Sequence, residues 1–432
     1  MKNFTKKQKI ILGTIIGIFL ILIIAGNNFM KKNTKGEIYV LGVGVEKSVI
    51  ESMSANIKKD VGNVVIKYTE VSEDKYLEKL QNSFTYGGQT YDIVMIKNDM
   101  LIDLKEYIEP FEITEEEVKT VYFDTVYRDF YREGKLYAKP IYIDTLALYY
   151  NRNILNKKGV FNVPTTWEEL VELVSKIKEV DEFGEIKLSG INMGSAYNVR
   201  HSVDVLSLLM MQYGTRVHDG NNALFANSVV YNNREIIPGE KALEFYTQFS
   251  NAGIANKYYT WNAGMDKDID LFASGKLAFY IGTGMDRGAI NEKNPNLDYG
   301  ISFMPQFENS PYEANLSSYY GFAVNKFSDK VGVAKKVVDY FSQPEVSAVF
   351  IEAYKLAPAV RSLSTLCSNQ YYQNVFCSQA INSFTWSKPV YSSSRQVFKD
   401  MIDNVSIKGS DSKDMVLAGQ EYINNIKKIE NE

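Results

Sequence analysis

Along most of the chain, apolar runs of strand length alternate with stretches that have the hydrophobic period of a helix. Residues 38–43, 64–68 and 92–96 form short apolar runs of strand length, and residues 74–82 have the pattern of a helix between two of them. Strands that alternate with helices predict an α/β protein whose parallel sheets are covered by helices on both faces.

Loops that follow the strands are the first places to look for a binding site. In open α/β sheets, ligands bind beyond the carboxyl ends of the strands. This rule directs attention to residues 44–47, 97–100 and 283–287. The chain has no linker rich in Pro, Gly or Ser and no internal repeat. This pattern is consistent with two lobes that are joined by strands crossing between them rather than by a flexible tether.

Residues 134–177 carry the clearest local pattern. An apolar strand at 141–150 is entered through Pro140, and a short helix, a loop and a second helix follow. Thr165 or Thr166 can cap that second helix, with Glu168 or Glu169 closing a capping box. Its buried stripe is expected to consist of Leu170, Val171, Val174 and Ile177.

Asp144 is the one polar residue that interrupts the middle of this strand. A carboxylate in a dry core is costly unless it is paired or hydrated. We therefore expect the strand to pass through a cleft.

The first 36 residues differ from the rest of the chain. They contain seven lysines and no acidic residue, and residues 10–26 are an unbroken apolar run with Lys2, Lys6, Lys7 and Lys9 before it. Seventeen helical residues span about 26 Å, close to the thickness of a bilayer's hydrocarbon core. The alternative is a signal peptide, but its apolar region is usually shorter and ends at a small-residue cleavage site. We expect a basic segment at 1–9, an uncleaved membrane anchor at 10–30 and a stalk at 31–36.

Charge and motif content exclude several classes of function. Beyond residue 36 the chain has 41 basic and 52 acidic residues, a net charge of −11, which disfavours nucleic-acid binding. The glycine pairs Gly42/Gly44 and Gly282/Gly284 do not continue as a nucleotide-binding fingerprint, so no cofactor is expected. No nucleophile motif or metal-binding cluster is present, and His201 is interpreted as a capping or surface residue.

Seven segments resemble a known family in the correct order. They are GEIYVLGVG, YLEKLQNSFTYGGQTYDIVMI, GKLYAKP with a strand ending in YYN, PTTWEEL, DLFASGKLAFYIGTG, YGISFMPQ, and GFAVNKFSDKVGVAKKVVDYFSQPE followed by KLAPAVRS. Together they resemble the extracytoplasmic solute-binding proteins of ATP-driven (ABC) importers, in the carbohydrate branch that includes maltose-binding protein. The resemblance covers residues 37–426.

This resemblance implies a two-lobed periplasmic-binding-protein-like (type II) fold with hinge strands. The first lobe is expected to contain residues 37–142 and 321–383, and the second lobe residues 143–320 and 384–432. The resemblance also places the bulk of the chain outside the cell, where we expect a monomer attached to the cell membrane through the anchor at 10–30. There, Cys367 and Cys377 can form a disulfide, although two independent thiols remain the alternative.

The resemblance also suggests ligand-binding residues. Asp144 falls at a position where the family has an acidic sugar ligand, Tyr197 where an aromatic ring stacks on a sugar, and Asp99 and Glu46 where ligand carboxylates occur. Each candidate has an alternative without a ligand. Asp144 would then be a carboxylate bonded by backbone amides, Asp99 and Glu46 solvated loop charges, and Tyr197 a half-buried surface ring.

Two aromatic positions of the family's maltose site are replaced. Met285 stands where a sugar-stacking tryptophan is common and Ile96 replaces another aromatic residue, which makes maltose itself doubtful. Trp261, Trp386 and Arg395 are candidates for replacement contacts, with core packing as the alternative for both tryptophans.

The combined prediction is a membrane-anchored receptor that binds a small polar solute, most simply a carbohydrate, and passes it to membrane permease subunits. It is not expected to be an enzyme. A surface sensor or adhesion module on the same fold is the runner-up. A glycoside hydrolase is a further alternative, because it needs only two suitably spaced carboxylates.

Overall fold

The computed structural model describes residues 36–84, 91–215, 222–250, 256–368, 371–386 and 391–430. The expected segments 1–9 and 10–30, and nearly all of the stalk, lie outside these residues. Among the residues described, no helix combines the length and apolar character that crossing a membrane requires.

The first lobe is built on a five-stranded sheet. Its strand order is β2-β1-β3-β16-β4, with bounds Val64–Val71, Gly36–Val43, Ile93–Lys97, Tyr320–Asn325 and Ile108–Glu109. β1 runs parallel to β2 and β3, whereas β16 runs antiparallel to β3 and β4. The prediction of a purely parallel sheet was therefore wrong, because β16 enters this lobe on the chain's return from the second one.

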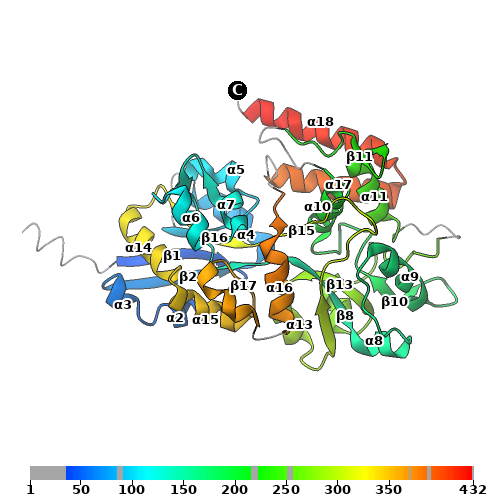
Figure 1. Cartoon of the computed structure of the whole chain (residues 1–432), viewed down its shortest axis with the longest axis horizontal. Coiled ribbons are helices and arrows are strands. Elements are labelled where there is room, and N and C mark those ends of the chain that lie inside the picture. The colour runs from blue at the N-terminus through cyan, green and yellow to red at the C-terminus, as the bar shows by residue number, and fades with distance from the viewer. Residues whose placement is uncertain are drawn as a thin grey trace, which may run out of the picture.

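Helices cover this sheet: α14 packs on β16, α4 on β1 and α2 on β2, and α15 packs on α2 (Figure 1). The helices of the first lobe are α2 (Lys47–Met53), α3 (Ile57–Asp60), α4 (Glu73–Ser83), α5 (Leu101–Leu104), η1 (Lys105–Tyr107), α6 (Glu115–Val121), α7 (Asp124–Phe130), α14 (Val331–Phe341) and α15 (Pro344–Tyr354). A hairpin of β5 (Tyr131–Arg132) and β6 (Lys135–Leu136) follows α7.

The second lobe has its own five-stranded mixed sheet. Its order is β14-β8-β13-β10-β9, with bounds Tyr299–Ser302, Leu146–Asn151, Leu277–Thr283, Ile186–Ile191 and Glu179–Val180. Only the β10–β13 pair is parallel.

Eight helices belong to this lobe within the described ranges. Two of them, α17 and α18, come from the C-terminal part of the chain and pack on α10 and α11. They are α8 (Arg152–Lys157), α9 (Trp167–Ile177), α10 (Ser202–Gln212), α11 (Pro238–Thr247), α12 (Asp268–Ala273), α13 (Asp286–Lys293), α17 (Tyr391–Lys408) and α18 (Ser412–Glu430). A hairpin of β11 (Val229–Tyr231) and β12 (Arg234–Ile236) adjoins them.

The predicted strand at 141–150 is split around Asp144 into β7 (Tyr142–Ile143) and β8. The second helix forms as expected: Thr166 and Glu169 make the capping box at the start of α9, and all four stripe residues are buried. Local sequence therefore determines this unit, apart from the break at the carboxylate.

Short paired segments connect the lobes. β7 pairs with β17 (Ala357–Pro358), and β15 (Asn315–Leu316) pairs with β18 (Ser383–Phe384). η2 (Arg361–Ser368) and α16 (Tyr371–Ile381) lie beside them, joined by the predicted disulfide between Cys367 and Cys377. Residues 143 and 383 belong to β7 and β18, and residue 320 is the first residue of β16, so the lobe boundaries expected at these positions stay a prediction.

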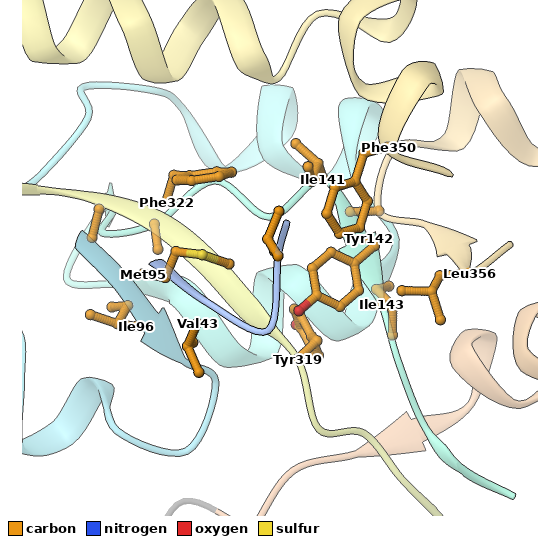
Figure 2. Close-up of a cluster of buried hydrophobic side chains, with 14 of the residues drawn as sticks. Val43, Met95, Ile96, Ile141, Tyr142, Ile143, Tyr319, Phe322, Phe350 and Leu356 are labelled. Atoms are coloured by element: carbon orange, nitrogen blue, oxygen red, sulfur yellow. The ribbon is translucent and has the colours of Figure 1, made fainter. Parts of the chain in front are cut away.

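One buried apolar cluster ties the connection to the first sheet. Figure 2 shows Met95 and Phe322 of that sheet close to Tyr142, Tyr319 and Phe350, and the rings of Tyr142 and Phe350 stack at 4.9 Å. Because the connecting strands are part of a core, they are firmly held where the lobes meet.

Candidate ligand-binding site

A cavity of about 440 Å³ lies between the two lobes at the connecting strands. The first lobe contributes the segments that follow β1 and β2, and the second lobe contributes the start of α10 and the loop after β13. The connecting strands contribute its base. The polar and aromatic side chains of the lining are Glu46, Glu70, Ser72, Glu73, Tyr142, Asp144, Arg200, His201, Thr283, Asp286, Glu292, Ser318, Tyr320 and Tyr354.

Asp144 is held rigidly by three backbone amides. Its Oδ1 accepts hydrogen bonds from the N–H groups of Thr145 and Gly284, both at 2.8 Å, and its Oδ2 accepts one from Met285 at 3.0 Å. Burial raises the pKa of this carboxyl to about 7, although the amides oppose the shift. Asp144 therefore fixes the loop after β13 against the connecting strand, at the edge of the cavity.

Gly284 is required for this arrangement. A Cβ atom at that position would overlap the Leu356 side chain and come within 2.9 Å of Asp144 Oδ1. The backbone can approach the carboxylate closely only because no side chain intervenes.

Asp286, in the first turn of α13, is the centre of a buried ionic group. Its Oδ2 lies 2.7 Å from His201 Nε2 and its Oδ1 lies 2.9 Å from Arg200 Nη1. Burial would lower the pKa of His201, but Asp286 and Asp204 raise it to about 10. The imidazole is therefore charged at neutral pH. His201 and Arg200 in turn hold the pKa of Asp286 well below its usual range, against the effect of burial.

Ion pairs continue from this group across the gap between the lobes. Arg200 Nη2 lies 3.6 Å from Glu73 of the first lobe. Asp204 of α10 lies 3.0 Å from Arg395 and 3.9 Å from Lys97, at the end of β3 in the first lobe. The two lobes are thus joined by an exposed ion pair and a buried one.

Comparison with known proteins identifies the family. The family model of bacterial extracellular solute-binding proteins matches residues 45–348. This chain belongs to that family. Its two lobes with a cavity between them agree with the membership, and the resemblance seen in the sequence motifs is confirmed.

Two curated relatives of this solute-binding protein are from Bacillus subtilis (strain 168). The maltodextrin-binding protein MdxE is 24% identical over 356 residues, which cover 81% of this chain and 80% of that protein. A galactooligosaccharide-binding protein is 24% identical over 339 residues, covering 77% and 75% of the two chains. The family consists of binding proteins, so the chain is not an enzyme.

Solved structures share the fold at low sequence identity. The GacH receptor of Streptomyces glaucescens aligns with a TM-score of 0.74 and 16% identity, covering 91% of this chain and 98% of the receptor. The sugar-binding protein MalE from Xanthomonas citri aligns with a TM-score of 0.70 and 19% identity, covering 92% and 98%. The two-lobed α/β fold predicted from sequence is therefore that of this solute-binding protein.

Three of the predicted binding residues line the cavity: Asp144, Glu46 and Met285. Glu46 is exposed just before α2, and its backbone N–H donates to the Tyr354 hydroxyl at 2.8 Å. Met285 is partly buried in the loop that Asp144 fixes.

Both tryptophan predictions were wrong, because both rings are core residues. Trp261 is fully buried and its Nε1 donates to Asn198 Oδ1 at 2.9 Å. Trp386 is 2% exposed and packs on Phe225 and Phe398. The polar surroundings of Trp261 in the sequence are misleading, since the backbone N–H groups of Thr260 and Trp261 donate hydrogen bonds to the carbonyl of Phe249, just beyond the end of α11, and hold the loop inward.

The remaining candidates lie outside the cavity lining. Tyr197 is 81% exposed on the second lobe. Asp99 is buried and Arg395 is partly buried in the charged group around Asp204, where they interact with other side chains of the protein. Arg395 forms an ion pair with Asp204 and is not among the residues that line the cavity, where its predicted ligand contact would be made.

Sequence reasoning missed Arg200, and it misread His201, which is 6% exposed and provides no side-chain cap. His201 does occupy the N-cap position of α10, as the capping interpretation expected, but its side chain makes no capping bond, and the surface alternative was wrong because the ring is buried. The loop at 283–287 was identified correctly, but nothing in the sequence indicated that Asp286 would meet two cations from a segment 85 residues away.

Proposed function

We propose that this protein is the extracytoplasmic receptor of an ATP-driven importer for a saccharide. The observation that supports this most strongly is the cavity of about 440 Å³, to which both lobes and the connecting strands contribute. This volume is in the range of small-molecule sites, about 300–1,000 Å³. The relatives named for maltodextrin and galactooligosaccharide binding favour a sugar.

The chemistry of the lining suits a polyhydroxylated ligand. Carboxylates such as Glu70 and Glu292 accept hydrogen bonds from hydroxyl groups, and charge-assisted bonds of this kind are strong. The rings of Tyr320 and Tyr354 offer apolar faces with polar tips. These two tyrosine rings would serve in place of the aromatic residues of the family's maltose site that this chain replaces.

Ligand binding would act by closing the lobes. A solute that contacts both lobes has a higher affinity for the closed state and shifts the population toward it. The closed form would then dock, as a monomer, on the permease subunits, and ATP hydrolysis elsewhere would drive transport.

The binding proposal is tested by calorimetric titration of the detergent-solubilised full chain with mono-, di- and trisaccharides. We expect saturable binding of at least one saccharide, together with a smaller radius of gyration in X-ray scattering. Amino acids and polyamines are the control ligands. Binding of these alone, or no binding to any saccharide, would contradict the proposal.

We further propose that residues 10–30 anchor the receptor in the cell membrane, where the anchor would keep it near its permease. Fractionation of cells that express the full chain should place it in the membrane pellet. A variant without residues 1–35 should stay in the soluble fraction of the same cells. If cells that express the full chain instead yield a shortened protein in the soluble fraction, the result would support cleavage of a signal peptide.

A further inference from the structure

The cavity has an unequal distribution of charge. Six carboxylates line it, and Arg200 and His201 are the only cationic residues among the lining residues of the described chain. The carboxylates are Glu46, Glu70, Glu73, Asp144, Asp286 and Glu292, of which Asp144 is only partly ionised at neutral pH because burial raises its pKa to about 7. Acidic residues therefore come from both lobes and from the connecting strand between them.

Both cations are already engaged by carboxylates of the protein. Asp286 contacts Arg200 at 2.9 Å and His201 at 2.7 Å, and Glu73 approaches Arg200 from the other lobe at 3.6 Å. An anionic ligand that reaches Arg200 would meet Asp286 and Glu73 beside the same guanidinium, and elsewhere in the cavity it would approach carboxylates that lack a counterion. Leaving a buried Asp286 without its partners would be strongly unfavourable.

Glu70 and Glu292 face the cavity from opposite lobes. Glu70 lies at the end of β2 and Glu292 on α13, and both are exposed. Within the described part of the chain, neither they nor Glu46 forms an ion pair; Glu46 accepts only a hydrogen bond from Ser48, at 3.2 Å. Three carboxylates on the rim are thus available to a ligand that enters between the lobes.

Like charges that face each other across a gap resist its closure. Bringing Glu46 and Glu70 of the first lobe toward Glu292 of the second raises their repulsion, because Coulomb energy grows as the distance falls. A neutral ligand leaves this repulsion in place. A cationic group held between the lobes offsets it and makes closure more favourable.

We propose that the cavity is selective for saccharides that carry a protonated amino group, and that it excludes saccharides that carry a carboxylate or phosphate. This inference rests on the proposed saccharide-binding function and specifies the ligand class of the same cavity. The three rim carboxylates are the residues that confer the charge preference, while Asp286 and Glu73 prevent Arg200 and His201 from attracting an anion.

The test is calorimetric titration of the full chain with matched disaccharides in three charge forms. The gluco-, galacto- and manno-configured sets each contain a neutral sugar, its amino-sugar counterpart and its uronic-acid counterpart. At about pH 6.5 the amines are protonated. We expect the amino form of the preferred set to bind about tenfold more tightly than the neutral form at low salt. The preference should shrink at about 500 mM salt, where screening is strong.

The double variant Glu70→Gln/Glu292→Gln should lower the ratio of amino-sugar to neutral-sugar affinity about fivefold or more. Glu182→Gln is the matched control. Glu182 is an exposed glutamate between β9 and β10 that does not line the cavity, so its replacement should leave the ratio unchanged.

The outcomes separate this inference from the proposed function. Equal affinity for neutral and amino forms, or preferential binding of the uronic acid, would overturn the charge preference and leave saccharide binding intact. A preference that survives in the double variant would contradict the role of the rim carboxylates. Failure of every saccharide to bind would overturn both.

Discussion

At the scale of single residues, Asp144 organises the site by accepting hydrogen bonds from backbone amides. It receives bonds from three N–H groups, two of which belong to the loop after β13. The resemblance to the family suggested a ligand contact for Asp144, and the structure adds a positioning role. Its side chain fixes the loop that carries Met285 and Asp286 at the cavity.

Asp144→Ala should therefore lower stability as well as ligand affinity. The substitution leaves three backbone N–H groups without their acceptor, and each unsatisfied buried group costs about 1–3 kcal/mol before relaxation. We expect a loss of ~2–4 kcal/mol in the free energy of unfolding, measured by urea denaturation followed by fluorescence. A variant that loses saccharide affinity at unchanged stability would contradict the positioning role.

A second buried carboxylate, Asp129, lies where the connecting strands meet the first lobe. It accepts hydrogen bonds from Tyr319 at 2.7 Å, Thr385 at 2.8 Å and Asn98 at 3.2 Å. Burial raises its pKa to about 6, although these three hydrogen bonds oppose the shift. The folded protein thus holds a proton on Asp129 in a range of pH where the unfolded chain has lost it.

This shift predicts the sign of a pH effect. Between about pH 4 and pH 6 the folded state binds more protons at Asp129 than the unfolded state, so this group lowers stability as the pH rises through that window. Asp129→Asn should remove about 1–3 kcal/mol of this decline. The measurement is the free energy of unfolding of each protein as a function of pH, obtained from urea denaturation at each pH. Parallel profiles would contradict the assigned shift.

At the scale of elements, the disulfide fastens η2 to α16 beside the connecting strands. Cys367 and Cys377 are ten residues apart, and their bond closes a short loop between a 3₁₀ helix and an α-helix. A crosslink stabilises mainly by restricting the unfolded chain, and a loop of this length is worth about 2–4 kcal/mol.

Reduction should therefore lower the melting temperature of the wild-type chain. The double variant Cys367→Ser/Cys377→Ser should melt at the lower temperature with or without reductant, because it has no crosslink to lose. Differential scanning fluorimetry of both proteins, each with and without dithiothreitol, makes the comparison. An equal response of the two proteins to reductant would show that the effect does not come from this bond.

At the scale of the whole molecule, ion pairs between the lobes couple the charge distribution to closure. The buried pair joins Lys97 of the first lobe to Asp204 of the second at 3.9 Å. Asp204 lowers the cost of burying Lys97, and it raises the pKa of that lysine well above its usual range even though burial opposes this. Separation of the lobes would break the pair.

Lys97→Met should shift the chain toward an open arrangement. Asp204 keeps Arg395 as a partner, so the variant should fold, but one buried attraction between the lobes is lost. We expect a larger radius of gyration without ligand and about tenfold weaker saccharide binding. Lys105→Met is the control, since Lys105 pairs with Glu133 within the first lobe. Identical scattering from Lys97→Met and wild type would contradict the coupling.

The sequence by itself determined the parts of this protein that depend on neighbouring residues. The capping box of Thr166 and Glu169 and the apolar strands of the first lobe follow from side chains a few positions apart. Ordered motifs then determined the family, because seven segments in sequence constrain a fold more strongly than any one of them.

Only the tertiary structure decided which side chains meet at the cavity. Arg200, His201 and Asp286 come together across 85 residues of chain, and Trp261 and Trp386 are drawn into cores that no local pattern indicates. Hydrophobic periodicity reports which face of an element is buried. It carries no information on which distant charge will lie 3 Å away, because that depends on how the two lobes pack together.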